Sequence, residues 1–433
     1  MDENGENGWM KTVKMGGWKR RKWVNSMNIL IFEYHNFGIE DVKETLIKNG
    51  HKYKAIESAL IKERKSTEFD SIFEKVYEEG INGRPYDCVF SFNYSPVISV
   101  NCNKVNLPYI AWVYDSPHVA LYSYTLINPC NHVFIFDKMQ YLELKNAGID
   151  TVYYEPLAVN IDRMKRMLDS KNDKNAQIAE QLKKTQSCDI SFVGAMYNEK
   201  HNLFKRLEGI SDYTRGYLES IMKAQRKVYG YYFLQEMLTP QIIADMQKAC
   251  PLEPSQDGVE TIQYLYADYF MARQMASDER IETLKLLGEK LGSQYKINLY
   301  THNATPELEK INNIGAIDYY DTMPYIFRNS RINLNITMQS IKSGIPLRGM
   351  DICAAGGFLM SNYQEDMYDI FVPGEDVVLY ESQEDLLAKC RYYLTQEAER
   401  QQIAANGYGK VVEKCSYDVR LEEMFAEVFN QRK

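Results

Sequence analysis

Runs of consecutive apolar residues alternate with helical periods from Asn28 onward. Most runs are five to seven residues long, and they predict strands at 28–34, 86–92, 109–114, 132–136 and 152–154. A strand that is apolar throughout is buried on both faces, which is typical of a parallel sheet covered by helices. A helical period at 39–49, ended by Gly50, predicts one covering helix. We therefore expect an α/β domain over residues 27–160.

The same alternation begins again after a polar stretch. Residues 161–187 are rich in Lys, Asp, Asn and Gln, so they predict a linker. Residues 200–290 have helical periods and few strand signals, and they predict a helical insertion. Further strands are expected at 188–194, 296–301, 315–319, 332–336, 357–361 and 376–380. The second domain is thus expected at 188–410, with a C-terminal helix over 411–433.

Two such domains predict the fold class: α/β, with two Rossmann-like, doubly wound domains that face a cleft and a helical insertion in the second. Ligands of doubly wound sheets bind outside the carboxyl ends of the strands. The cleft between the two sheets is therefore the place to look for a site.

Size and composition narrow the class of protein. A chain of 433 residues is long for one core and agrees with two domains. The net charge of −8 argues against a nucleic-acid partner, which needs a basic face. Eight cysteines without a C-x-x-C pair are typical of reduced thiols in a cytoplasmic protein. No apolar run is long enough to predict a transmembrane segment.

Residues 1–26 are polar, carry three tryptophans and the basic cluster at 19–22, and lack the apolar core of a signal peptide. We interpret them as a flexible extension. The alternative is a basic-aromatic segment that makes a peripheral contact with an acidic membrane surface.

The strongest indication of function is a segment that reads SIKSGIPLRGMDICAAGGFLMSNYQ. It predicts a short helix before a buried strand, and the free N–H groups at the helix start near Gly344 suit an anion. Arg348 offers a planar fork for phosphate, and Asp351, one turn further on, offers acceptors for two ribose hydroxyls. Gly356 and Gly357 allow close approach. The alternative is that both glycines end a helix and Asp351 lies at the surface.

Further polar residues extend this predicted nucleotide site. Polar groups beside the segment are expected to contact a donor sugar or phosphates: Thr337, Gln339, Ser340 and Lys342. Ser343 is expected among the residues that bind the nucleotide. The strand at 188–194 ends in Gly194, and Lys200 in the following loop is placed to neutralise a diphosphate. The alternatives are that Asn335 and Thr337 are turn residues and that Lys200 is a solvated loop lysine.

The segment WVYDSPH in the first domain supplies candidates for acid–base chemistry. Asp115 and His118 follow the strand at 109–114, where a base that deprotonates an acceptor hydroxyl is expected. The alternative is a helix cap, because Asp and Ser before Pro often precede a helix. Residues at the ends of nearby strands are expected to shape the acceptor pocket: Asn93, Tyr94 and Trp112.

Several motifs are absent from the sequence. No D-x-D triplet indicates a metal-dependent nucleotide-sugar enzyme, so no metal is expected. No GxxxxGK[ST] or GxGxxG loop occurs, which excludes P-loop NTPases and dinucleotide-dependent dehydrogenases. We therefore expect no cofactor.

Three segments together resemble a known family. NITMQSIKSGIPLRGMDICAAGGFLMSNYQEDM, then FVPGEDVVLYESQEDLLAKCRYYL, then IAANG, resemble the C-terminal half of the spore-maturation CgeB-type group 1 glycosyltransferases of the GT-B fold. WVYDSPH, VFIFDK and YEPLAVN are similar to the domain that precedes it in that family.

The resemblance implies a nucleotide sugar bound by the second domain, an acceptor bound by the first, and no essential metal. In related enzymes an acid before the small-residue run binds the ribose, and Asp351 occupies that place. Those enzymes often carry a second acid eight residues earlier, where this chain has Ser343. This departure bears on the donor-sugar contact and on any retaining mechanism.

The expected function is transfer of a sugar from a nucleotide diphosphate to a hydroxyl of a glycan, protein or spore component. Two alternatives stay open: a non-catalytic nucleotide-sugar-binding assembly protein, and a GT-B nucleotide-sugar epimerase. Ser343 in place of the acid favours the first alternative. The fold alone does not choose between them.

Overall fold

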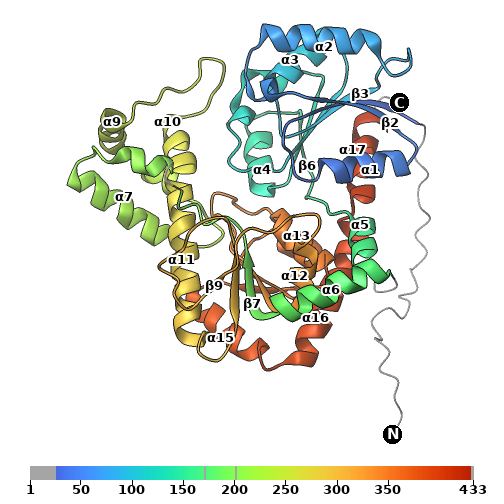
Figure 1. The fold of residues 1–433 in the computed structure, drawn as a ribbon. Coiled ribbons are helices and arrows are strands. Elements are labelled where there is room, and N and C mark those ends of the chain that lie inside the picture. The colour runs from blue at the N-terminus through green and yellow to red at the C-terminus, as the bar shows by residue number, and fades with distance from the viewer. Residues whose placement is uncertain (1–25, 170–171, 200–201, 431–433) are drawn as a thin grey trace.

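Six parallel strands form the first sheet, in the order β2-β1-β3-β4-β5-β6. A computed structural model describes residues 26–169, 172–199 and 202–430, and Figure 1 shows this sheet in the upper domain. Its strands are β1 Asn28–Glu33, β2 Lys52–Glu57, β3 Cys88–Phe92, β4 Tyr109–Val113, β5 Asn131–Ile135 and β6 Val152–Tyr154. Its helices are α1 Ile39–Lys48, α2 Thr67–Glu79, α3 Pro96–Lys104 and α4 Lys138–Asn146.

The apolar runs form the central strands of this sheet because both of its faces are covered. All five residues of β3 and of β4 are buried, and separate apolar clusters lie on the two faces. Strand β2 was not predicted from the sequence. It lies at the sheet edge, its residues are mostly half-buried, and its lysines alternate with apolar residues.

The second sheet also has six parallel strands, in the order β12-β11-β10-β7-β8-β9. These are β7 Cys188–Val193, β8 Ile297–Tyr300, β9 Asn312–Asn313, β10 Ser330–Asn335, β11 Leu359–Asn362 and β12 Val378–Tyr380. The strand predicted at 315–319 is wrong, since only β9 forms in this region and Gly315 has a left-handed φ of 98°. The accompanying helices are α12 Met323–Asn329, α13 Leu347–Ala354, α14 Met367–Ile370, α15 Gln383–Tyr393 and α16 Glu397–Lys414.

Two segments connect the domains. The stretch expected as a linker forms α5 Ile161–Met167 and α6 Asp173–Gln186, and α6 packs against α12 of the second domain. The final helix, α17 Tyr417–Asn430, returns to the first domain and packs beside α1 (Figure 1). The helix predicted from residue 411 thus falls on the end of α16 and on α17. The two places where the chain crosses between the domains lie side by side. There the Val159 amide donates a 2.9 Å hydrogen bond to the Cys415 carbonyl.

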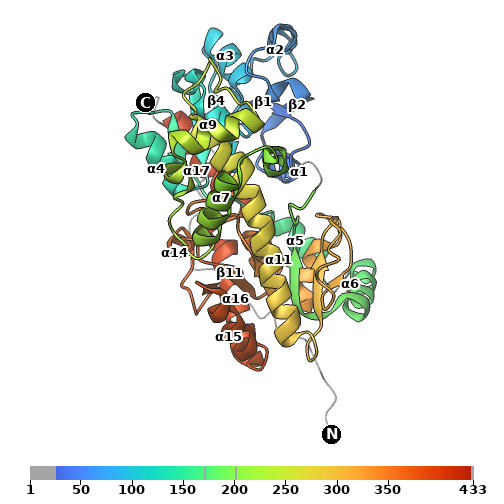
Figure 2. The ribbon, with the colours of Figure 1, turned by 90° about the vertical axis from the view of Figure 1, so that its left-hand side faces the viewer.

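The helical insertion stands between β7 and β8. It contains a 3-10 turn at Leu203–Leu207, α7 Asp212–Gln225, α8 Leu234–Met237, α9 Pro240–Ala249, α10 Ile262–Tyr264, a π-helix at Leu265–Met271 and α11 Ala272–Leu291. These helices share an apolar core of their own. Figure 2 shows α11 running along the side of the molecule from the insertion toward the lower domain.

The insertion also contacts the first domain. The Val259 amide donates to the Tyr122 carbonyl at 2.8 Å, and the Tyr124 amide donates to the Asp257 carbonyl at 3.0 Å. The Arg64 guanidinium pairs with the buried Glu260 carboxylate at 2.7 Å. The insertion therefore joins both domains on one side of their junction.

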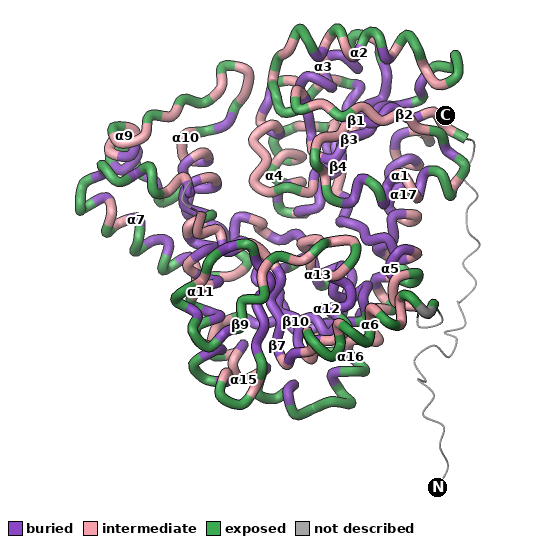
Figure 3. Tube along the Cα trace, in the orientation of Figure 1, coloured by how far each residue is buried: buried purple, intermediate pink, exposed green. Residues whose placement is uncertain are grey.

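Burial follows this architecture. Figure 3 shows the central strands of both sheets buried and the outer sides of α7, α15 and α16 exposed. Within the described ranges, no helix combines the length and the apolar composition needed to cross a membrane. Apart from Ser26, the expected extension at 1–26 lies outside the described residues.

Candidate functional site

The loop after β10 meets the first domain at the start of α4. Asp137 caps α4 by accepting a hydrogen bond from the Gln140 amide at 3.2 Å, and it is fully buried. The same carboxylate accepts bonds from the Lys342 amide at 2.7 Å and from the Ser343 hydroxyl at 3.0 Å. Burial raises the pKa of Asp137, and these hydrogen bonds oppose the rise. Asp137 therefore fixes one loop of the second domain against the first.

Ser343 and Gly344, both predicted to contact the nucleotide, lie in this contact. The Ser343 hydroxyl also accepts a 3.0 Å hydrogen bond from the Met139 amide. A Cβ atom at Gly344 would lie 2.7 Å from the Phe136 ring, so glycine permits the close approach of the two domains. The sequence predicted the helix start, with its free N–H groups, near Gly344. Helix α13 begins at Leu347, so these N–H groups lie further along the chain than predicted.

Arg348 and Asp351 are brought together on α13, as predicted. Asp351 is 1% exposed, its Oδ1 accepts a 3.1 Å hydrogen bond from the Tyr319 hydroxyl, and its Oδ2 lies 3.8 Å from Arg348 Nη1. Asp351 is thus not the surface residue of the alternative interpretation. Burial raises the pKa of Asp351 to about 6, and the positive charges of Arg348 and Arg163 oppose this rise.

Arg163 links this cluster to the first domain. Its Nε and Nη2 donate to the two carboxylate oxygens of Asp41 in α1, at 2.9 and 3.1 Å. Its guanidinium also lies 4.8 Å from the centre of the Tyr320 ring. The Tyr320 hydroxyl accepts a bond from the Gly38 amide at 3.1 Å. Asp351 therefore lies in a buried polar layer between the two domains.

Three glycines of the predicted site have visible backbone roles. Gly356 ends α13 with a φ of 75°. A Cβ at Gly357 would lie 2.8 Å from the Phe327 carbonyl, so the chain passes close to α12 before β11. Gly194 ends β7, and a Cβ there would lie 3.3 Å from the Phe192 ring. Close packing thus explains Gly357 and Gly194, and the left-handed backbone explains Gly356.

Of the other polar residues predicted beside the nucleotide, Thr337, Gln339 and Lys342 are bonded within the protein, whereas Ser340 Oγ has no partner among the described residues. The Thr337 amide donates to Asn362 Oδ1 at 2.9 Å, and Gln339 Oε1 accepts from Gln225 at 3.1 Å. Lys342 Nζ donates to both carboxylate oxygens of Glu143 in α4, at 2.5 and 2.6 Å. In this structure Lys342 therefore joins the domains. Lys200 lies outside the described residues.

Two charged residues that the sequence did not single out lie at the strand ends. Arg280 of α11 donates to the Ala195 carbonyl at 2.5 Å and to the Ile336 carbonyl at 2.8 Å, after β7 and β10. The neighbouring Glu279 accepts a 3.0 Å bond from the Tyr229 hydroxyl, and burial raises its pKa to about 7. A charged Asp-Glu-Arg run on a helix is typical of a solvated face, so the sequence carried no signal of their burial.

The acceptor candidates divide into exposed and buried groups. Asp115 is exposed and accepts a 2.7 Å hydrogen bond from the Asn93 side chain. His118 Nε2 lies 2.8 Å from the Tyr94 carbonyl, which can only accept, so Nε2 carries a proton. Burial lowers the pKa of His118. Trp112 is fully buried and donates to the Glu155 carbonyl.

The structure thus gives Tyr94 and Trp112 packing roles. The Tyr94 hydroxyl bonds to the Thr125 hydroxyl at 2.8 Å, and the Trp112 ring packs edge-on against Tyr417 of α17. Asn93 has a φ of 60°, and its side chain accepts bonds from two amides of the following loop. Asn93 therefore holds the loop that carries Asp115.

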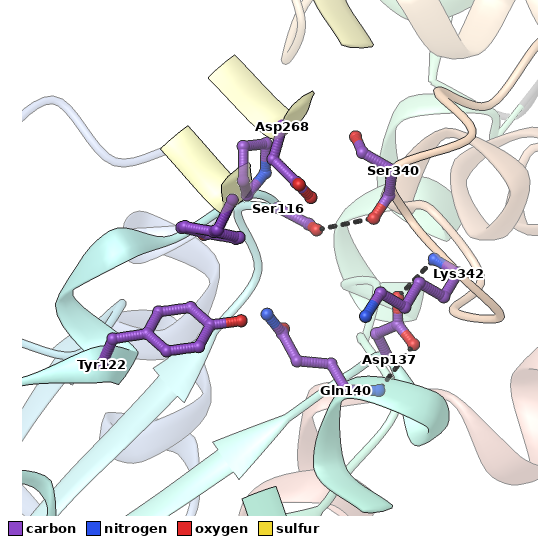
Figure 4. A pocket seen from close by; sticks show the side chains of 9 residues that line it. Ser116, Tyr122, Asp137, Gln140, Asp268, Ser340 and Lys342 are labelled. Carbon is purple, nitrogen blue, oxygen red and sulfur yellow. Dashed lines mark hydrogen bonds between the residues drawn. The ribbon is translucent and has the colours of Figure 1, made fainter. Parts of the chain in front are cut away.

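A polar pocket lies where the first domain, the insertion and the loop after β10 meet. Figure 4 shows Ser116 and Tyr122, Asp137 and Gln140, Asp268, and Ser340 and Lys342 around it. Within the described ranges, no group of three or more His, Cys, Asp or Glu side chains is arranged to hold a metal ion.

Comparison with known proteins identifies the fold. Residues 259–426 match the sequence profile of a family described as glycosyl transferase-like. This range includes the loop after β10, α13 and most of α17. No curated protein matches the chain.

Solved structures share the fold over nearly the whole chain. Sucrose-phosphate synthase from Thermosynechococcus elongatus is 11% identical, with a TM-score of 0.52, and the match covers 94% of this chain and 100% of that one. HepE from Anabaena in complex with UDP and glucose is 9% identical, with a TM-score of 0.51 and the same coverage. A glycosyltransferase from Rickettsia africae is 13% identical, with a TM-score of 0.51, covering 94% and 98%. The predicted GT-B fold is confirmed.

Proposed function

We propose that this chain is a glycosyltransferase that moves a sugar from a nucleotide-diphosphate sugar to a hydroxyl of a glycan or protein. The GT-B fold and the glycosyl transferase-like match over residues 259–426 support the reaction class. The UDP and glucose bound to the Anabaena neighbour support a nucleotide-sugar donor. The sequence resemblance extends the proposal to the CgeB-type group, and the cytoplasm is the compartment we propose.

The observation that carries the proposal is the buried carboxylate of Asp351. It is 1% exposed, and its Oδ2 accepts no hydrogen bond from the described residues. An ionised carboxylate has more acceptor sites than the one bond from Tyr319 uses. Two vicinal hydroxyls of a ribose are suitable donors for the remaining sites. The carboxylate lies within the segment that matches the glycosyl transferase-like family.

Donor entry requires the two domains to part, since Asp351 is buried between them. The adjacent crossings at Val159 and Cys415 are the natural hinge for this motion. Closure then excludes water from the reacting bond. The bonds of Asp137 to Lys342 and Ser343 would be made in the closed state.

Departure of the diphosphate needs positive charge. We assign this role to Arg348 and Lys200, together with the N–H groups at the start of α13. These groups would do the electrostatic work that a divalent cation does in other nucleotide-sugar enzymes, so the reaction is proposed to be metal-independent. An assay in EDTA tests the proposed metal independence, and we expect the activity to be unchanged.

A non-catalytic nucleotide-sugar-binding protein is the second candidate. The observation in its favour is Ser343, which stands where related enzymes often carry an acid and is bonded to Asp137. A binder would hold nucleotide sugars without releasing a nucleoside diphosphate. The two candidates therefore differ in turnover and not in affinity.

The test measures release of nucleoside diphosphate from a panel of UDP, GDP, dTDP, CDP and ADP sugars. Arg348→Ala should lower turnover at least about 10²-fold, because it removes charge stabilisation of the leaving group. Arg328→Ala, which changes an exposed arginine of the neighbouring α12, is the matched control. Wild-type turnover by the Arg348 variant would refute the phosphate assignment. Binding without turnover by the wild type would favour the non-catalytic candidate.

A further inference from the structure

A small pocket at the meeting of three parts of the chain has no role in the steps above. It lies between Ser116 and Tyr122 of the first domain, Gln140 of α4, Asp268 of the insertion and Ser340 of the loop after β10. Its cavity volume is about 10 Å³, which is room for about one water-sized group. The pocket is therefore suited to a single hydroxyl.

Three buried side chains of the pocket, those of Ser340, Gln140 and Tyr264, have a polar atom without a hydrogen-bond partner among the described residues. Ser340 is 3% exposed and Gln140 is 7% exposed, and neither Ser340 Oγ nor Gln140 Oε1 has a hydrogen-bond partner among the described residues. Buried polar groups are nearly always bonded, to protein, to ordered water or to a ligand, so these atoms are free to bond a polar group in the pocket. A hydroxyl both donates and accepts, so it can bond either a serine hydroxyl or an amide oxygen.

Asp268 adds a carboxylate to the pocket. It is 3% exposed, and one carboxylate oxygen accepts a 2.7 Å hydrogen bond from Gln235. Figure 4 shows the carboxylate pointing toward the space between Ser116, Ser340 and Gln140. A carboxylate beside a bound hydroxyl is positioned to accept its proton.

Titratable and charged groups of the first domain, the insertion and the loop after β10 surround Asp268. Burial raises the pKa of Asp268 to about 7; Lys342 and Gln235 oppose the rise, and Glu143 adds to it. The other titratable groups that face this region are Asp137 of α4 and the tyrosines 122, 264 and 269. A pKa near neutrality is what an efficient general base requires.

The backbone that carries Asp268 is unusual and firmly held. Asp268 is the fourth residue of the π-helix Leu265–Met271, and π-helical segments are rare and frequent at functional sites. The hydroxyl of the next residue, Tyr269, accepts a 2.7 Å hydrogen bond from the Val119 amide. The insertion thus fixes Asp268 against the segment that follows the strand end at Asp115.

We propose that the pocket takes the reacting hydroxyl of the acceptor and that Asp268, not Asp115 or His118, accepts its proton. The assignment rests on the proposed glycosyl transfer. The acceptor oxygen forms a bond to the anomeric carbon while the bond from that carbon to the diphosphate breaks. The proton passes to Asp268, and the electron pair leaves with the nucleoside diphosphate. Neither Asp115 nor His118 lines the pocket.

The experiment uses water as the probe nucleophile, because the pocket holds one water-sized group. Release of nucleoside diphosphate from the glucose esters of UDP, GDP, dTDP, CDP and ADP is followed against pH in the full-length chain. Asp268→Asn and Asp268→Glu are compared with Asp278→Asn, a control in α11 that lies outside the pocket. Nucleoside diphosphate binding is measured in parallel by calorimetry.

The wild-type rate should rise with pH through about 7, since Asp268 must be ionised to accept a proton. Asp268→Asn should lower kcat about 10²–10⁴-fold, with KM and diphosphate binding unchanged. It should also abolish the rise of the rate with pH. Asp268→Glu should restore part of the rate, and Asp278→Asn should match the wild type.

Four results would overturn the assignment. Asp268→Asn with the wild-type rate and pH profile shows that another group takes the proton. Asp268→Asn that has also lost diphosphate binding shows a structural role. A wild-type chain that binds a nucleoside diphosphate yet hydrolyses none of the esters contradicts a hydroxyl site. A wild-type chain that binds none of the diphosphates contradicts the proposed function itself, and the assignment with it.

Discussion

The Ser343 hydroxyl donates a 3.0 Å hydrogen bond to the buried carboxylate of Asp137, across the junction of the two domains. This relationship gives a physical reason for serine at a position where the enzymes that the sequence resembles often carry an acid. A carboxylate at 343 would face the carboxylate of Asp137 in a site shielded from water, where like charges repel strongly. Serine donates a hydrogen bond instead and joins the domains.

Substitution of Ser343 tests this relationship. Ser343→Ala should lower the free energy of unfolding by about 1 kcal/mol, the usual value of a lost hydrogen bond. Ser343→Asp should lower it further at neutral pH, because it adds a second negative charge beside Asp137. Urea unfolding at neutral pH measures both variants. An aspartate variant as stable as the alanine variant would mean that the two side chains do not face each other.

Gly344 gives a second prediction about the same contact. A Cβ at this position would lie 2.7 and 2.8 Å from two carbon atoms of the Phe136 ring. Gly344→Ala should therefore lower the free energy of unfolding by about 1–3 kcal/mol, as overpacking commonly does. Its matched control is Gly216→Ala in α7, where no atom lies within 4 Å of the added Cβ. That change should stabilise the helix by about 0.5–1 kcal/mol. Equal melting temperatures for the two variants would contradict the close approach.

Buried carboxyls predict how stability changes with pH. Burial raises the pKa of Asp268 and Glu279 to about 7, and that of Asp351 and Asp366 to about 6. In the unfolded chain such groups titrate near 4, so between about pH 6 and pH 8 only the folded chain holds these protons. The free energy of unfolding should therefore rise as the pH falls from 8 to 6. The gain from each group is lost as the pH rises through its folded pKa.

Urea midpoints at the two pH values measure this effect. The double variant Asp268→Asn/Glu279→Gln removes two of the groups and should flatten the dependence. A wild-type midpoint that is higher at pH 8 than at pH 6 would mean that these carboxyls are ionised in the folded chain.

The sequence predicted those strands and helices whose own residues are enough to indicate their structure. The apolar runs of β3 and β4 are buried on both faces, so their composition was sufficient. Strand β2 escaped detection because lysines interrupt its apolar residues at the sheet edge. The segment at 161–187 is polar on its outer side, yet α6 is held by its packing on α12, which only the tertiary structure provides.

The candidate site was predictable only in part. Arg348 and Asp351 lie three residues apart on one helix, so local spacing was enough to bring them together. The partners of Lys342 and Ser343 are Glu143 and Asp137, about two hundred residues earlier in the chain. Asp268 lies in the insertion, whose helical period gave no sign that one carboxylate reaches the domain junction. Contacts between distant segments are not encoded in local periodicity.

A donor site built on Asp351 is tested by a thermal-shift screen of nucleotide sugars. Wild type and Asp351→Asn are heated with UDP, GDP, dTDP, CDP or ADP sugars, with and without EDTA. A ligand that binds the native state raises the melting temperature by mass action. The account predicts a shift from one nucleotide family, unaffected by EDTA and absent in Asp351→Asn. No shift with any donor, or an equal shift in the variant, would contradict a donor site built on Asp351.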